Sequence, residues 1–438
     1  MGACEQGLAA VVAGRELKVV LSPTDNMTKP RFRQSSGCNA RVYLVVTAVC
    51  LISAVLAANP EIGQAQTTAG KGFRPPSTLP LTRFYDTPHP LPAGKPGELI
   101  RSETIDQYNL PYELSAWRIL YHSRAANGED VAVSAVVLIP DGKPPASGWP
   151  VIAWAHEFRG AARQCAPSVK KNLGAGPILA MYANLGYAVV ATDYSGLGAD
   201  SGKSVADMES NAFDVMYSVT AARAAVPQIG PKWIAVGPFQ GGLAAVGVGE
   251  SEVRDPGYLG SVVTSGVADA QETYERFARG SSFDSNLNSS RMLLVLASTL
   301  KAIYPEFRVS DLLKDEALPA YQRVAETCGG ETEPEFKSGM LKPEWESNHF
   351  VNEFFRRNTP GEKRAHGPLL VISGESDPAI PVDMSEKTVG RMCKQGSRIL
   401  FLKYPNLDAS GVMGASAADQ ISWIKARFAG HAAPGNCH

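Results

Sequence analysis

Apolar β-prone runs alternate with helical stretches over most of this chain, and this pattern restricts the fold more than any other feature. The predicted strands lie at residues 131–140, 151–156, 188–193, 233–236, 262–265, 369–373 and 399–404. Several are continuous runs of Val, Ile, Leu and Ala, as in parallel strands covered on both faces. The predicted helices lie at residues 176–186, 210–226, 241–253, 383–395 and 416–428. The alternation predicts an α/β fold, with a mostly parallel sheet flanked by helices.

The sharpest local signal is at residues 233–242, which read Trp-Ile-Ala-Val-Gly-Pro-Phe-Gln-Gly-Gly. An apolar strand, the glycines Gly237 and Gly241, and a small-residue helix start form the frame of a nucleophile elbow, G-x-S-x-G. The glycines of that motif let two backbones approach closely. Phe239 stands where the motif has serine, and no G-x-S-x-G occurs elsewhere in the sequence. Because phenylalanine has no oxygen, acyl transfer through this position is excluded.

Composition limits the function classes without indicating a chemistry. The 438 residues suit one large domain with an insertion, or two domains, once a leader is removed. Charged residues are 19% of the chain and the formal net charge is −1, so no general attraction to nucleic acid is expected. No His/Cys spacing resembles a zinc site, and neither a metal nor a cofactor is expected.

The N-terminal segment 1–65 is predicted to be an extension followed by a secretory signal peptide. Lys29, Arg31, Arg33 and Arg41 precede an apolar run at residues 42–58, and Gly63-Gln64-Ala65 supplies small residues for cleavage. The mature chain is then secreted and keeps no stable membrane span. The alternative is an N-terminal membrane anchor, because the run is near the lower length limit for crossing a bilayer.

Four cysteines remain after the predicted leader, namely Cys165, Cys328, Cys393 and Cys437. In an exported chain they imply two disulfides among three possible pairings. Four unrelated buried thiols are the alternative.

The remaining chain divides into four predicted segments. Residues 66–100 are rich in Pro and Gly and suit an extended arm. Residues 101–269 and 366–438 form the two parts of the α/β core. Residues 270–365, where strand signals pause, are expected to be an inserted helical cap at the carboxyl edge of the sheet, where such folds bind ligands. Its apolar run at 292–300 either lines a pocket or only packs the cap onto the sheet.

Six short motifs, in order, resemble the secretory lipase family of α/β-hydrolases (the lipase A type). They are Pro96-Gly97-Glu-Leu-Ile-Arg101, Leu120-Tyr-His-Ser-Arg124, Trp154-Ala-His156 with Cys165-Ala-Pro-Ser168, Asp193-Tyr-Ser-Gly-Leu-Gly198, Gly374-Glu-Ser-Asp-Pro378, and Trp423-Ile-Lys-Ala-Arg-Phe-Ala-Gly430. The resemblance runs from about Phe84 to Cys437 and implies an α/β-hydrolase fold with an inserted cap. It also implies disulfides Cys165–Cys328 and Cys393–Cys437.

When the catalytic triad of the family is carried over to this sequence by the resemblance, most of it is missing. Asp377 matches the triad acid, whereas Phe239 replaces the nucleophile. The position of the histidine base falls at Ala409, or at Leu407 in an alternative alignment. After Asp377 the only histidines are His431 and His438, beyond the last predicted helix. Without a base to orient, Asp377 is better explained as a loop cap.

The oxyanion loop departs from the family as well. The family has His-Gly followed by small or polar residues, whereas this chain has His156-Glu-Phe-Arg-Gly160. Glu157, Phe158 and Gln240 occupy the positions of this loop and of the residue after the nucleophile. A carboxylate at Glu157 opposes negative charge developing nearby, and one lost oxyanion donor alone costs about 3–4 kcal/mol of transition-state stabilisation.

Two functions follow as hypotheses. The first is a secreted pseudo-lipase that holds an apolar or acyl ligand without cleaving it. The second is an active triacylglycerol lipase or carboxylesterase with a relocated nucleophile, for which Ser195 and Ser265, near strand ends, are the candidates. His156 is interpreted as a structural residue at the end of a buried strand.

Overall fold

The computed structural model of the chain describes residues 77–437, apart from 113, 204–205, 281–288, 325 and 329–337. The chain divides into two units, Met1–Arg74 and Pro75–His438. The predicted signal peptide at 27–65, and with it the alternative of a membrane anchor, lies outside the described residues. Within the described part, none of the helices has the length and apolarity that crossing a membrane requires.

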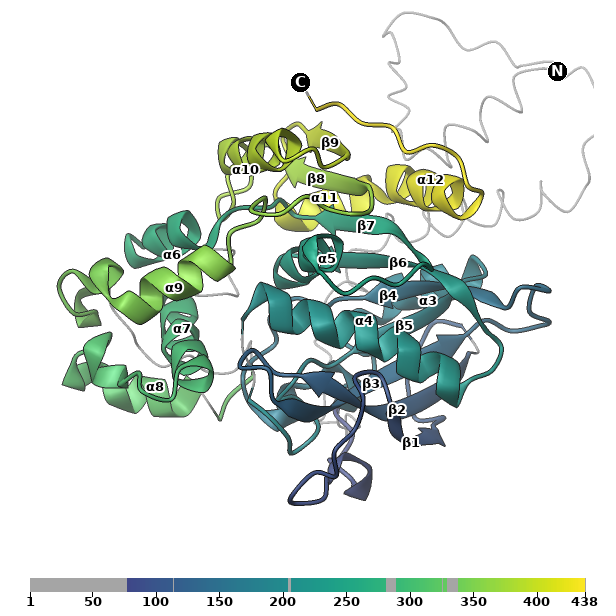
Figure 1. Cartoon of the computed structure of the whole chain (residues 1–438), viewed down its shortest axis with the longest axis horizontal. Coiled ribbons are helices and arrows are strands. Elements are labelled where there is room, and N and C mark those ends of the chain that lie inside the picture. Colours follow the sequence, from purple (N-terminus) through teal and green to yellow (C-terminus); the bar gives the residue numbers. More distant parts are fainter. Residues whose placement is uncertain are drawn as a thin grey trace, which may run out of the picture. The chain divides into compact units, whose positions relative to one another are not determined.

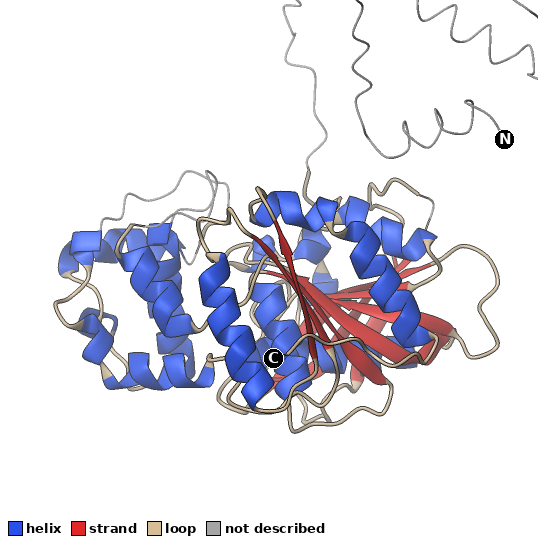
Figure 2. Cartoon of the chain, turned by 90° about the horizontal axis from the view of Figure 1, so that it is seen from above, coloured by secondary structure: helices blue, strands red, loops and turns tan. Residues whose placement is uncertain are grey.

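A nine-stranded sheet runs through the second unit, and its strands are the red arrows of Figure 2. The order is β1-β2-β3-β5-β4-β6-β7-β8-β9. Pairs β1–β2, β2–β3 and β3–β5 are antiparallel, and all later pairs are parallel, so the prediction of a mostly parallel sheet is confirmed. The strands are β1 Leu99–Thr104, β2 Ser115–Arg124, β3 Asp130–Ile139, β4 Trp149–Trp154, β5 Ala188–Thr192, β6 Ile229–Pro238, β7 Tyr258–Thr264, β8 Leu369–Gly374 and β9 Ile399–Tyr404.

Helices cover both faces of the sheet, which explains why its central strands lack polar alternation. Every residue of β5 and of β8 is buried. Side chains of α4, α5 and α10 pack on one face, and side chains of α3, α11 and α12 pack on the other. These helices are α3 Gly176–Asn184, α4 Met208–Ala225, α5 Gln240–Glu250, α10 Val382–Lys394, α11 Ala409–Ala415 and α12 Ala417–Phe428.

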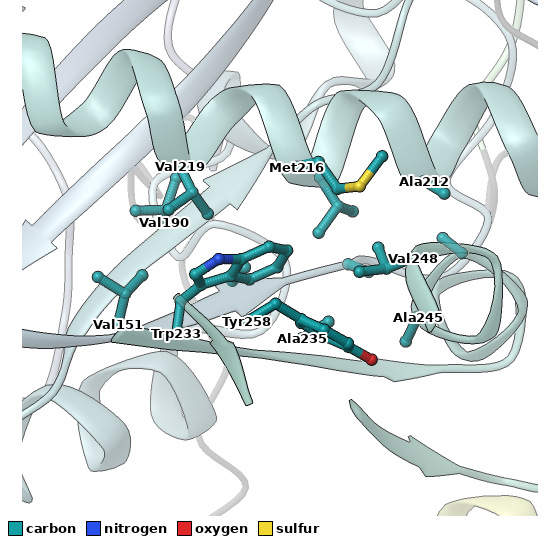
Figure 3. Packing of buried hydrophobic residues seen from close by; sticks show 14 of the residues in the cluster. Val151, Val190, Ala212, Met216, Val219, Trp233, Ala235, Ala245, Val248 and Tyr258 are labelled. Carbon is teal, nitrogen blue, oxygen red and sulfur yellow. The ribbon is translucent and has the colours of Figure 1, made fainter. Parts of the chain in front are cut away.

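Trp233 on β6 anchors the core below the elbow (Figure 3). Its side chain is fully buried, with Met216 and Val219 of α4 above it and the ring of Tyr258 at a centroid distance of 5.0 Å. Its indole Nε1 donates a 3.0 Å hydrogen bond to Asp255. Burial of one large apolar side chain contributes about 1.5–3 kcal/mol, so this cluster fixes β6 and the bend that follows it.

The helical cap predicted at 270–365 is present and lies to one side of the sheet (Figure 1). It contains α6 Ala270–Ala278, α7 Ser289–Ile303, α8 Leu318–Val324 and α9 His349–Arg357. Its apolar side chains form a second core, in which Phe277, Leu296 and Phe354 are buried together. Side chains of Asp269 and Asn348 accept hydrogen bonds from the first turns of α6 and α9 and so begin these helices.

Strands β1 and β2 were not predicted from the sequence. Arg118, in the middle of β2, is buried against the rings of Phe84 and Tyr85, with its Cζ 5.1 and 5.3 Å from their centroids. These two rings belong to the predicted arm at 66–100 and pack against Leu120 of β2 and Ala132 of β3. A charged residue interrupts the apolar pattern by which a strand is recognised in a sequence, so β2 was not predicted. The cation–π contacts with the two rings offset part of the cost of burying the guanidinium group.

Both disulfides of the structure are the pairs that the family resemblance implies. Cys165–Cys328 joins the loop after β4 to the cap, and Cys393–Cys437 joins α10 to the C-terminal tail. The first therefore ties the cap to the core next to the candidate site.

Candidate functional site

The elbow at Phe239 keeps the backbone of a nucleophile elbow. Phe239 has φ 48° and ψ −118°, a conformation that costs a non-glycine residue about 1–3 kcal/mol. The flanking glycines are required by close backbone contacts. A Cβ on Gly237 would lie 2.3 Å from the carbonyl oxygen of Gly241, and one on Gly241 would lie 1.9 Å from that of Ala155. Strand, bend and helix are thus those of a hydrolase elbow, with a phenyl ring at its apex.

A cavity of about 300 Å³ lies between this elbow and the cap. From the core it is lined by Phe239, Leu243 and Met413, among others, and from the cap by Tyr274, Phe277 and Phe354. Its walls are mainly apolar, as in most small-molecule sites. The elbow apex therefore faces a cavity suited to an apolar group.

Asp377, the predicted match to a triad acid, caps its own loop. Its Oδ1 accepts hydrogen bonds from the backbone N–H groups of Ala379 and Ile380, at 2.8 and 3.1 Å. Its Oδ2 is buried and has no hydrogen-bond partner among the described residues. Burial raises the pKa of this carboxyl to about 6, and the nearby Asp408 carboxylate adds to the shift.

Ala409 lines the same cavity as Phe239, whereas Leu407 packs against the sheet core. Ala409 is the first residue of α11 and is 4% exposed. Between the two alignments of the base position, this geometry favours Ala409.

The described histidines lie away from the cavity walls. His156 is 3% exposed and packs on Tyr194 at a centroid distance of 4.1 Å. Its Nδ1 lies 2.6 Å from the carbonyl oxygen of Glu157, and its Nε2 lies 3.1 Å from that of Asp193. Burial lowers the pKa of its imidazole below the ordinary value. Both ring nitrogens thus face backbone carbonyls of neighbouring loops, which is a structural role.

The two candidate relocated serines do not line the cavity either. The hydroxyl of Ser265 donates to the carbonyl oxygen of Ala409 at 2.9 Å, and the hydroxyl of Ser195 is buried. Among the described residues no hydrogen bond joins a serine hydroxyl to a histidine ring, so neither candidate is activated by a base. Ser410, one residue after the base position, lines the cavity and was not predicted from the sequence.

The loop after β4 brings two opposite charges to the cavity. Glu157 and Arg159 both line it, and their side chains form an ion pair. Arg159 also donates a 2.9 Å hydrogen bond to the carbonyl oxygen of Gly174. Phe158 and Gln240 line the cavity too, so the predicted oxyanion positions are brought together with Phe239.

An ion-paired contact between cap and core also borders the cavity and was not foreseen. The guanidinium Nε of Arg357 on α9 lies 2.7 Å from Oδ2 of Asp207, and its Nη2 donates to Oδ1 at 3.1 Å. Asn358 adds a 3.2 Å hydrogen bond to the same carboxylate and accepts one from the N–H of Met208. The sequence around Asp207 indicates only an N-cap for α4. The ion pair itself could not be predicted, because its partners lie 150 residues further along the chain.

No protein-family model matches the sequence, and no curated protein is similar enough in sequence to match. Solved structures are similar in fold. Candida antarctica lipase A in its closed state has a TM-score of 0.68 at 18% identity, over 82% of this chain and 89% of the lipase. The rice cell wall degrading esterase LipA from Xanthomonas oryzae has a TM-score of 0.62 at 17% identity, over 76% of this chain and 98% of the esterase. The chain thus has the α/β-hydrolase fold found in lipases and esterases.

Proposed function

We propose that this protein is a pseudo-lipase, an α/β-hydrolase-fold protein that binds an apolar or acyl ligand between its elbow and its cap and does not hydrolyse it. The observation that carries the proposal is Phe239 at the strained apex of the elbow, above a cavity that no described histidine lines. Nucleophile and base act as one unit in acyl transfer, so losing both leaves at most about 10³–10⁴-fold rate enhancement over water.

The intact framework supports retained binding. The cap and the elbow still enclose a cavity with a mainly apolar wall, which is the feature that a ligand with an acyl chain requires. The oxyanion loop also differs from that of the family, because it carries the ion pair Glu157–Arg159 in place of small or polar residues, and this argues further against hydrolysis.

The first test is hydrolysis of p-nitrophenyl butyrate by the purified mature chain, with a serine-directed phosphonate as probe. We expect no turnover above that of heat-denatured protein and no covalent adduct in the intact mass. Turnover that the phosphonate abolishes would overturn the proposal and support a relocated serine.

Restoring the missing groups provides the second test. Phe239→Ser alone is expected to remain inactive, because nothing accepts the proton of the serine. Phe239→Ser with Ala409→His supplies a serine and an imidazole at the predicted nucleophile and base positions, and we expect at least about tenfold more ester hydrolysis than in either single variant. An active Phe239→Ser single variant would show that another base already serves the elbow.

We also propose that the protein is exported. The two disulfides fit an extracellular protein, where such bonds persist. The segment at 27–65 is the proposed signal peptide.

A further inference from the structure

Acidic side chains gather where the cavity meets the elbow and α11. Glu157 and Asp408 line the cavity there, and Asp377 bonds through Oδ1 to the N–H of Ile380, another lining residue. The loop of Asp377 contacts the segment of Asp408, because the N–H of Ser376 donates a 2.9 Å hydrogen bond to the carbonyl oxygen of Leu407. The Asp408 carboxylate also raises the pKa of Asp377. We call the part of the cavity wall at Asp408, next to the loop of Asp377, the acidic end.

Two of the carboxylates around the cavity are neutralised by cations of the protein. Glu157 is paired with Arg159, and Asp207 is paired with Arg357. Each pair is held by further hydrogen bonds to the protein, from Arg159 to the carbonyl of Gly174 and from Arg357 to that of Ala126. These guanidinium groups are therefore already bonded and are poor partners for an anionic ligand.

Asp377 and Asp408 together carry more charge than the cation beside them. Arg276 on α6 is that cation, and it donates a 3.2 Å hydrogen bond to the carbonyl of Pro378. Among the described residues that line the cavity, Glu157 and Asp207 are paired with guanidinium groups, whereas no ion pair neutralises Asp408. The surplus is negative, and it lies at the acidic end.

The two sides of the cavity also differ in their exposure to solvent. Asp408 and Ser410 on the α11 side are exposed to solvent, whereas Phe277 and Phe354 on the cap side are buried. A ligand with one polar end and one chain gains most by placing the chain under the cap and the polar end beside α11.

We infer that the cavity takes amphiphiles whose head group is neutral or cationic and donates hydrogen bonds, such as an alcohol or an amine, and that it discriminates against carboxylates. This inference rests on the proposed function. A carboxylate head group beside the acidic end meets like charge in a partly desolvated site, while a hydroxyl or ammonium group donates to carboxylate oxygens. The ligand class therefore differs from the fatty acid that ester hydrolysis would release.

The test compares three octyl compounds that differ only in the head group, octylamine, octan-1-ol and octanoate, by isothermal titration calorimetry at pH 7.5. We expect octylamine to bind at least about tenfold more tightly than octanoate, with octanol between them. Asp408→Asn is expected to reduce this ratio severalfold. Asparagine also caps helices well, so α11 should keep its start. Asp141→Asn, on an exposed loop, removes the same charge from the molecule and should leave the ratio unchanged.

The experiment distinguishes a failure of this inference from a failure of the proposed function. If octanoate binds as tightly as octylamine, or if Asp141→Asn changes the ratio as much as Asp408→Asn does, the assignment of ligand charge is wrong while ligand binding stands. If none of the three compounds binds, the proposed binding function falls, and the inference falls with it.

Discussion

Asp214 on α4 illustrates what a single buried carboxyl contributes to this fold. It is fully buried and is held by neutral donors, the hydroxyl of Ser123 at 2.5 Å and the N–H of Ser195 at 2.8 Å. Burial raises the pKa of this carboxyl to about 7, although its hydrogen bonds act in the opposite direction. Around pH 5–6 the folded state therefore holds a proton that the unfolded chain, with an aspartate pKa of about 3.9, has released.

The sign of the pH dependence follows from this difference. The stabilisation is fully present below pH ~4 and is lost as the pH rises through the folded-state pKa of about 7. Asp214→Asn should make the free energy of unfolding less dependent on pH between 5 and 8 and raise it at pH 8 by about 1–3 kcal/mol. Urea denaturation at several pH values measures this, with Asp141→Asn as control. An unchanged slope would contradict the raised pKa. Some slope should remain, because burial also raises the pKa of Asp193 to about 6 and of Glu250 to about 7.

Among the elements, the junction of β6 and α5 tolerates the least change. Gly241→Ala would put a methyl group within 1.9 Å of the carbonyl oxygen of Ala155, which is backbone and cannot move aside. We expect a loss of at least about 3 kcal/mol of stability, or failure to fold. Gly390→Ala in α10, where nothing lies within 4 Å, should instead gain about 0.5–1 kcal/mol. Thermal melts of both variants measure the contrast, and similar melting temperatures would refute the close approach.

Elements were predictable where one local rule dominated. The buried parallel strands have continuous apolar runs, so β4 to β9 could be located from the sequence. β1 and β2 were missed because antiparallel strands at the sheet edge carry polar and charged residues, Arg118 among them. The short helix α11 was missed because its sequence, Ala-Ser-Gly-Val-Met-Gly-Ala, has weak helix propensity, and the N-cap bond from Gly411 to Asp408 supports it.

At the scale of the whole molecule, the cap is attached to the core at several separate places. Arg357 pairs with the fully buried Asp207, Lys387 on α10 pairs with Glu272 on α6, and the disulfide Cys165–Cys328 adds a covalent link. The two ion pairs could not be predicted, because each joins residues more than 100 positions apart, whereas the disulfide was implied by the family resemblance. Phe239 and Ala409, which were predicted as two positions of one site from the fixed order of the triad, both line the cavity, whereas Asp377 is not among the lining residues.

The buried pair Arg357–Asp207 should matter most for stability. Arg357→Met leaves an uncompensated buried carboxylate and is expected to cost about 3–5 kcal/mol in urea denaturation. Asp207→Asn with Arg357→Met removes both charges and should recover much of the loss. Lys363→Met breaks an exposed pair with Glu252 and should cost less than about 1 kcal/mol. If Arg357→Met and Lys363→Met lowered the free energy of unfolding equally, the buried pair would contribute no more than a surface pair.

The bend at position 239 is supported by backbone contacts beneath it. Gly241 and Ala155 meet backbone to backbone there, and the residue at the apex lines the enclosed cavity. A cysteine, a lysine or a spectroscopic label introduced at position 239 is therefore expected to face the cavity, with no other change to the sequence.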